Sequence, residues 1–399
     1  MLHALFSLVG TRVNPPLNSL LQAANAAASQ GRWSEALALL QQAHRAAPRD
    51  PGILMRVAHA LRETGDREGE GRAIEAALAI DPYFLPALLA KAAIAERNAG
   101  WRASAPLYRN AIAAAPPEPQ WPPGLQGALA HGKGVVARYA EAMQTFLEDR
   151  LSMPASRLKP EEAARWHEAG ALVAGRAKPY PSVANRLQVP RLAALTFFDR
   201  ARFPWARAIE AATPAITEEF RAVHARDNAE FRPYVQYAPG TPVNQWEALN
   251  HSRRWSSYFL WRNGAPMAEH QRDCPATTAA LAEVEMAEIA GLCPNAMFSA
   301  LAPHTHIPPH HGETNARLVV HLPLIVPPNC RYRVGADTTP WTVGELLIFD
   351  DSIEHEARND SDELRVVLIF DVWNPLLSPD EREMVRAISA ATRDFHLQE

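Results

Sequence analysis

Six histidines between residues 304 and 355 are the side chains whose type and spacing best suit chemistry. Four of them fall within eight residues, and two follow further along the chain: His304, His306, His310, His311, His321 and His355. Neutral imidazoles on adjoining strands suit a borderline divalent metal, since each offers one lone pair and the sheet fixes its direction. A single histidine is more often a surface or core residue, so the prediction of a metal site depends on the whole cluster.

The segments that must position these histidines are predicted to be short strands. From Asn295 onward, the runs AMFSALA, ARLVVHLPLIV, CRYRV, ELLIFD and LRVVLIFDVW are rich in β-branched residues and separated by Gly, Pro, Asn or Asp. Short strands at such intervals are typical of a barrel or a double-sheet roll of the jelly-roll class. Ahead of them, WSSYFLW predicts another strand, and one helix each is expected over residues 201–223 and 274–291.

Two long segments resemble the catalytic core of a known enzyme family. The runs PHHGETNARLVVHLPL and GELLIFDDSIEHEARNDSDELRVVLIFDVWNP are similar to the aspartyl/asparaginyl β-hydroxylases, and the similarity extends from about Arg202 to Pro375. The resemblance implies a double-stranded β-helix (jelly-roll) oxygenase domain that uses iron(II), 2-oxoglutarate as cosubstrate and O2. It also implies hydroxylation of the β-carbon of an Asp, Asn or similar residue in a peptide or protein.

The resemblance assigns the iron ligands residue by residue. His310 in PHHGETN and His355 in DDSIEHE would bind the iron, and Gly312 stands where most related oxygenases carry a carboxylate ligand. Water would then take the place of that carboxylate. A second register stays open, because His311, Gly312 and Glu313 spell His-x-Glu, which together with His355 would give two histidines and one carboxylate.

The resemblance also assigns residues that bind the organic substrates. Arg365 and Ser299 would hold the distal carboxylate of 2-oxoglutarate, and His321 would be a donor near its keto-acid end. A guanidinium suits this role because it stays charged when buried and binds a carboxylate through two parallel hydrogen bonds. Arg317 would grip a substrate carboxylate, with a purely structural ion pair as the alternative. Where the family's animal enzymes carry a further arginine, this chain has Val319, which leaves hydroxylation of a small molecule or a lipid acyl chain open.

The N-terminal part of the chain repeats itself every 34 residues, which is the period of tetratricopeptide helix pairs. The repeated positions carry Gly31 and Gly65; Trp33 and Trp101; Leu40, Ile74 and Tyr108; Ala43, Ala77 and Ala111; and Pro48, Pro82 and Pro116. Small alanines let helices approach closely, larger side chains fill the groove between them, and proline ends the outgoing helix. The middle copy departs from the pattern at Arg67 and Glu70.

The sequence as a whole therefore predicts an α+β multidomain chain. An N-terminal α-helical tetratricopeptide-like solenoid would span residues 17–118 and offer a concave surface to a peptide or protein partner. A helical bridge and Pro-rich connector would span residues 119–200, and the oxygenase domain residues 201–399. A non-catalytic scaffold is the alternative from another class of protein, although the intact set of His310, His355 and Arg365 argues against it.

Composition excludes some other classes of protein. With 399 residues, 47% of them hydrophobic, the chain is too long for a single small stapled module, and a net charge of -4 gives no general attraction to nucleic acid. Three cysteines are too few and odd in number for the disulfide framework of a secreted protein. The first residues, MLHALFSLVGTRVNPP, lack the basic region and cleavage site of a signal peptide. No segment approaches the ~20 apolar residues that span a bilayer, and a cytoplasmic location is predicted.

Overall fold

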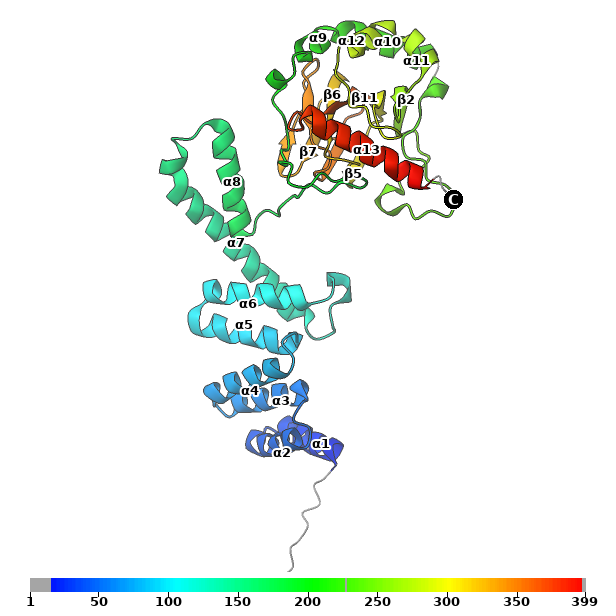
Figure 1. Ribbon diagram of the computed structural model, residues 1–399. Coiled ribbons are helices and arrows are strands. Elements are labelled where there is room, and N and C mark those ends of the chain that lie inside the picture. Colours follow the sequence, from blue (N-terminus) through cyan, green and yellow to red (C-terminus); the bar gives the residue numbers. More distant parts are fainter. Residues whose placement is uncertain (1–15, 227, 397–399) are drawn as a thin grey trace, which may run out of the picture. The chain divides into compact units, whose positions relative to one another are not determined.

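The computed structural model describes residues 16–226 and 228–396, and the chain divides into two compact units between Ala177 and Lys178. The first unit is helical, and the second is built around two β-sheets (Figure 1). This order confirms the predicted fold class. The start of the chain, where the absence of a signal peptide was predicted, lies outside the described residues. Within the described ranges, no helix is both long enough and apolar enough to cross a bilayer.

Over its described residues, 16–177, the first unit has eight α-helices: α1 (Leu17–Ser29), α2 (Trp33–Ala46), α3 (Pro51–Glu63), α4 (Arg67–Ile80), α5 (Leu85–Ala99), α6 (Trp101–Ala114), α7 (Gln126–Ala155) and α8 (Pro160–Ala174). The first six pack as three successive helix pairs. The repeated alanines Ala43, Ala77 and Ala111 are completely buried at the helix contacts, which allows the close approach that the 34-residue period predicts.

The departures from the repeat pattern in the middle copy are accommodated by ion pairs. Glu70 takes the place of a small residue and is only 5% exposed. Its carboxylate is paired with Arg67 at 3.4 Å and with Arg97 at 3.1 Å. A buried carboxylate is tolerated when cations neutralise it, so the middle pair keeps the repeat geometry with polar contacts.

The strands of the second unit form two antiparallel sheets. The larger sheet has the order β1-β2-β4-β11-β6-β9 with β3 beside β2, and the smaller has the order β5-β10-β7-β8. Their bounds are β1 (Arg232–Pro233), β2 (Trp255–Arg262), β3 (Ala265–Pro266), β4 (Ala296–Leu301), β5 (Thr305–His310), β6 (Arg317–Ile325), β7 (Cys330–Val334), β8 (Asp337–Thr339), β9 (Leu347–Phe349), β10 (His355–Asn359) and β11 (Arg365–Trp373). The predicted strand WSSYFLW is confirmed as β2.

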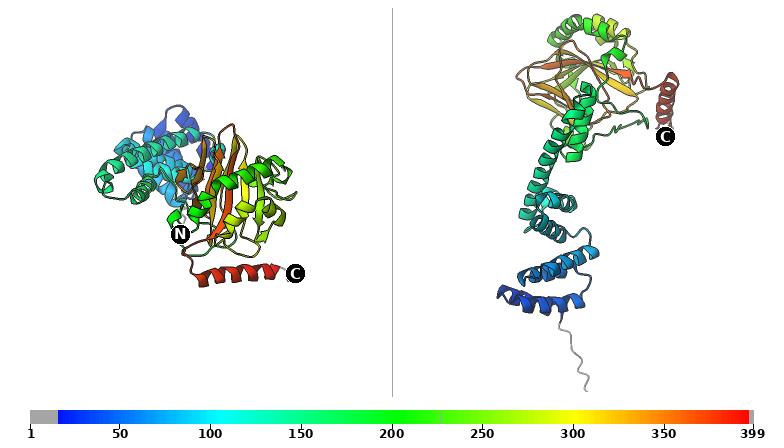
Figure 2. Two further views of the ribbon diagram at one scale, coloured as in Figure 1. Left: turned by 90° about the horizontal axis from the view of Figure 1, so that it is seen from above. Right: turned by 90° about the vertical axis from the view of Figure 1, so that its left-hand side faces the viewer.

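The two faces of the larger sheet have different partners. Leu318, Val320 and Leu322 of β6 point to an apolar core shared with α9 (Ala206–Ala211), α10 (Thr213–Arg226) and α12 (Pro275–Ala282), which lie along one side of the sheet (Figures 1 and 2). The opposite face turns toward the smaller sheet. Because side chains alternate along a strand, Arg317, Val319 and His321 of β6 must point between the sheets.

Two further α-helices of this unit lie outside the two sheets. They are the short α11 (Ala268–Asp273), which contacts β2, and the C-terminal α13 (Pro379–His396). The side chain of Val385 anchors α13 in a small apolar cluster with Trp373 and Leu377.

Two helix predictions in this unit are wrong in extent. The helix expected over residues 201–223 is interrupted before Thr213, giving α9 and α10. The helix expected over residues 274–291 ends at Ala282. Beyond it the backbone pairs with β11 instead, through a bridge between Met286 and Val372 and a hydrogen bond from Ala287 N–H to Asp371 C=O. Pairing with the end of β11, beyond the last residue that pairs with β4, outweighs local helix propensity here.

Candidate active site

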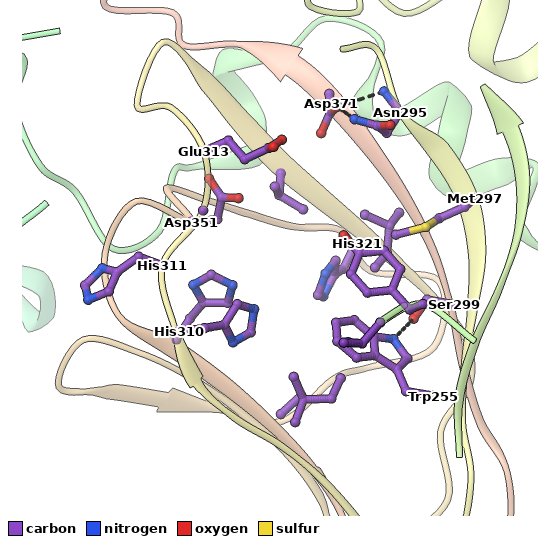
Figure 3. A pocket seen from close by; sticks show the side chains of 18 of the residues that line it. Trp255, Asn295, Met297, Ser299, His310, His311, Glu313, His321, Asp351 and Asp371 are labelled. Atoms are coloured by element: carbon purple, nitrogen blue, oxygen red, sulfur yellow. Dashed lines mark hydrogen bonds between the residues drawn. The ribbon is translucent and has the colours of Figure 1, made fainter. Parts of the chain in front are cut away.

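A cavity of about 460 Å³ opens between the two sheets (Figure 3). All six residues predicted from the sequence to serve the site line it: Ser299, His310, Arg317, His321, His355 and Arg365. They come from five strands, and β11 adds Ile369 and Asp371 to the same wall as Arg365 because every second side chain faces the cavity.

His310 and His355 face each other across the pairing of β5 with β10. Their ring centroids are 4.0 Å apart. The Nδ1 atom of His310 lies 2.8 Å from Pro308 O, and that of His355 lies 3.0 Å from Ile353 O. A carbonyl oxygen only accepts hydrogen bonds, so each Nδ1 carries the proton and each Nε2 keeps its lone pair.

Both imidazoles are held in the neutral form. Burial lowers the pKa of His310 to about 3, with a further lowering by His355, and burial lowers the pKa of His355 to about 4. Neutral imidazoles with a fixed tautomer are suited to act as metal ligands. Across residues 16–226 and 228–396, no group of three or more His, Cys, Asp or Glu side chains could hold a metal, so this pair stands without a carboxylate at ligand distance.

Arg365 is a buried cation without a hydrogen-bonding partner at two of its nitrogens. The residue is 1% exposed, and its Nε and Nη1 atoms make no hydrogen bond to any residue that the structure describes. Its guanidinium carbon lies 4.8 Å from the centre of the Trp341 ring, and burial lowers its pKa to about 10. A guanidinium in such surroundings is costly unless an anion joins it. The arrangement is therefore suited to receive a carboxylate.

Two tryptophans that the sequence did not single out orient the polar groups near Arg365. The indole N–H of Trp255 donates to Ser299 Oγ at 3.1 Å, and that of Trp341 donates to His321 Nδ1 at 3.3 Å. Burial, followed by the charge of Arg365, lowers the pKa of His321 well below its usual value. The ring of His321 is thus neutral, accepts at Nδ1, and can donate from Nε2.

Arg317, by contrast, is already paired with carboxylates. Its Nη1 lies 3.0 Å from Asp351 Oδ2, and its Nε lies 3.4 Å from Asp371 Oδ1. Burial opposes its charge, but Asp351 and Asp371 outweigh that effect and raise its pKa. Asp371 is fixed in turn by the backbone and side-chain N–H groups of Asn295. Neither aspartate was predicted as a site residue, because an aspartate in a strand or loop carries no local signal of its partner.

Asp351 occupies the space that a side chain at position 312 would need. A Cβ atom added to Gly312 would lie 2.0 Å from Asp351 Oδ2. Asp351 Oδ1 is buried and has no hydrogen-bond partner. The glycine in HGE thus allows a carboxylate from a distant turn to enter the cavity wall.

The two alternative ligands that the sequence suggested, His311 and Glu313, contact other groups. The ring of His311 points away from that of His310 (Figure 3), and its Nδ1 lies 2.9 Å from Ser352 O. The carboxylate of Glu313 is 3.1 Å from Arg186. Glu313, Asp351 and Asp371 gather on one side of the cavity, whereas Ser299 and His321 lie on another (Figure 3).

We expect Gly312→Ala to lower the free energy of unfolding by about 1 to 3 kcal/mol, because the added methyl group must displace the Asp351 carboxylate. In an Asp351→Ala background, the same change should cost almost nothing, since the space is then free. Chemical denaturation of the wild type, both single variants and the double variant completes the cycle. Equal costs of Gly312→Ala in both backgrounds would show that the two side chains do not compete for this space.

Comparison with known protein families identifies two regions of the chain. Residues 210–375 match the family model described as aspartyl/asparaginyl beta-hydroxylase, and residues 17–60 match a tetratricopeptide repeat. The first match includes all six predicted site residues.

Several curated relatives share the second unit. An ornithine lipid ester-linked acyl 2-hydroxylase of Rhizobium tropici is 38% identical over 185 residues, which are 46% of this chain and 62% of that protein. The aspartyl/asparaginyl beta-hydroxylase of Mus musculus is 37% identical over 153 residues, which are 38% of this chain and 20% of that protein. Human aspartate beta-hydroxylase domain-containing protein 2 is 34% identical over 145 residues, 36% of this chain and 39% of that protein.

The chain therefore spans less than two thirds of the length of each of these three relatives. What the matches show is that residues 210–375 are similar to the aspartyl/asparaginyl β-hydroxylase family and that a tetratricopeptide repeat precedes them.

Proposed function

We propose that the second unit is an iron(II)- and 2-oxoglutarate-dependent oxygenase that hydroxylates a carbon atom of its substrate. His310 and His355 would hold the iron through Nε2, and Arg365, with Ser299 and His321, would hold 2-oxoglutarate. The observation that carries the proposal is the unpaired guanidinium of Arg365 in the same cavity as two neutral imidazoles.

The residues present fit the metal. Both Nε2 lone pairs are available because the Nδ1 atoms face backbone carbonyls. His310 and His355 would hold the metal from one side of the cavity and leave the rest of the cavity to the cosubstrate and the substrate. Asp351 Oδ1, which is buried and unpaired, is an acceptor suited to a water molecule in this wall.

The residues present also fit 2-oxoglutarate. The Nε and Nη1 atoms of Arg365 have no hydrogen-bond partner among the described residues, so the guanidinium can donate to a carboxylate. His321 is fixed as a donor by Trp341, and Ser299 adds a hydroxyl. Iron(II), 2-oxoglutarate and dioxygen together supply an oxidation that inserts one oxygen atom into a C–H bond and gives succinate and carbon dioxide. The chain's own part is to orient these groups and to exclude water with apolar walls such as Phe349 and Ile369.

As substrate we propose an Asp, Asn or similar residue of a peptide or protein, hydroxylated at its β-carbon. The family match of residues 210–375 supports this choice, and the tetratricopeptide-repeat helices would recruit the partner. All three cysteines are unpaired and buried, which supports the proposed cytoplasmic setting.

A lipid acyl chain or an apolar small molecule is a second candidate substrate, and the charges of the cavity favour it. Arg317 is already neutralised by Asp351 and Asp371, so it offers little to a substrate carboxylate. Val319 adds an apolar side chain to the same face of β6. The relative from Rhizobium tropici acts, by its name, on an ester-linked acyl chain of ornithine lipid.

We expect the purified protein with iron(II) and ascorbate to convert 2-oxoglutarate to succinate, and His355→Ala to abolish this turnover because one of two metal ligands is lost. His311→Ala is the matched control and should retain most of the turnover, since that ring points away from the pair. Succinate is measured by mass spectrometry. Unchanged turnover in His355→Ala would refute the assignment of His355 as a metal ligand. No turnover in the wild type would favour the alternative that the chain is a non-catalytic scaffold.

Arg365→Met should weaken the binding of 2-oxoglutarate without lowering the free energy of unfolding. Methionine fills a similar volume without a charge, so the free energy of unfolding of the ligand-free protein should stay level or rise. The affinity for 2-oxoglutarate should fall by about 2 kcal/mol or more, because the carboxylate loses its charge partner. Calorimetric titration and chemical denaturation measure the two effects. A large loss of stability with unchanged affinity would place the anchor elsewhere.

The two substrate candidates are distinguished by offering both to the same enzyme. An acyl substrate would gain one oxygen atom by mass spectrometry, while Asp- and Asn-containing peptides would stay unmodified; the first candidate predicts the reverse. Val319→Arg should reduce acyl hydroxylation at least about tenfold, because a buried cation would meet an apolar chain. Val319→Ile is the control of similar polarity and should retain it.

A further inference from the structure

The segment between the helical repeats and the matched family domain is a structural part of the site. Residues 178–200, called the connector below, belong to the second unit and precede the family match, which begins at residue 210. The connector was predicted as a Pro-rich link. In the structure it follows the edge of the β-sheet unit (Figure 1) and contacts the two turns next to His310 and His355.

The first of these turns joins β5 to β6, and the connector binds three successive carbonyl groups in it. Asn185 donates from Nδ2 to His311 O at 2.7 Å and from its backbone N–H to Gly312 O at 2.9 Å. The backbone N–H groups of Arg186 and Leu187 both donate to Glu313 O at 3.0 Å. This turn follows His310 directly, so the connector restrains the chain immediately after that residue.

The same turn is held a second time at Asn315. Its side-chain amide accepts from Val189 N–H at 2.7 Å and donates to Val189 C=O at 2.9 Å. Asn315 is only 1% exposed. Two reciprocal hydrogen bonds to one residue fix both the position and the orientation of the connector against the turn.

The second turn precedes His355 and is bound by an earlier part of the connector. The backbone N–H of Val183 donates to Ser352 O at 2.8 Å, and the hydroxyl groups of Ser182 and Ser352 are 2.7 Å apart. Ser182 also forms a β-bridge with Ile353, whose carbonyl accepts from the ring of His355.

We infer that the connector is a positioning element of the metal site, with Asn185 and Asn315 as its positioning residues. It joins the turn after His310 to the turn before His355, and so limits how far the two imidazoles can separate. Asn185 also lines the cavity itself. The expected effect on metal affinity rests on the proposed function. The restraint on the two turns does not, because it needs no metal.

Groups that orient metal ligands from outside the ligand set affect metal affinity strongly. Loss of such a partner typically reduces affinity about 10- to 100-fold, and we expect this range for Asn315→Ala, which removes both bonds to Val189. Asn185→Ala removes one hydrogen bond at an exposed position and should reduce affinity about three- to tenfold. Because Asn185 is exposed, this second variant should fold even if the buried one does not.

The experiment uses the full chain and two measurements. Backbone hydrogen exchange over residues 310–316 and 350–355, without metal, reports the restraint on the turns. Titration with cobalt(II), a spectroscopic divalent probe, reports the affinity of the site. In both variants exchange should become faster over residues 310–316, the turn that Asn185 and Asn315 hold, and cobalt affinity should fall. Residues 350–355, which Ser182 and Val183 bind instead, serve as the internal reference.

Val183→Ala is the matched control, because its side chain is exposed and only its backbone binds Ser352; it should change neither quantity. Unchanged exchange in Asn185→Ala and Asn315→Ala, or faster exchange with unchanged cobalt affinity, would overturn the inference. If the wild type binds no divalent metal, the proposed function is wrong, and the exchange measurement alone decides whether the connector holds the turns.

Discussion

The unpaired charge of Arg365 is the constraint on which the second unit depends. A guanidinium that is 1% exposed and has two nitrogens without partners raises the free energy of the folded chain. The surrounding sheets must therefore be stable enough to hold it in place. Apolar side chains on the opposite face of β11, among them Val366, Leu368 and Phe370, are completely buried against the helices and supply that stability.

The two buried arginines of the cavity show how position alone changes what a residue can do. Arg317 on β6 meets two carboxylates and serves the wall, whereas Arg365 on β11 meets a tryptophan ring and stays available to an anion. On one side of the cavity, the charge of Arg317 is thus paired with carboxylates of the chain itself. On the other side, the charge of Arg365 has no such partner among the described residues. This difference is what suits the second side to the carboxylate cosubstrate that we propose.

Tetratricopeptide-repeat helices and the β-sheet unit are two compact bodies, each with its own apolar cores. The connector begins where the helices end, and its hydrogen bonds reach the turns beside His310 and His355. In the proposed function, the connector is therefore the element that lies between the repeats and the matched family domain in sequence and holds the proposed metal site through a short series of hydrogen bonds.

The sequence alone determined the strands and helical repeats, since alternation and a 34-residue period are local properties. With the help of a family resemblance it also predicted His310, His355 and Arg365 as site residues, and the structure brings all three to one cavity. Only the tertiary structure decided which groups meet them. Trp341 beside His321 and the connector on the HGETN turn are contacts between residues far apart in the chain. Such contacts depend on sheet register and closure, which a local pattern does not specify.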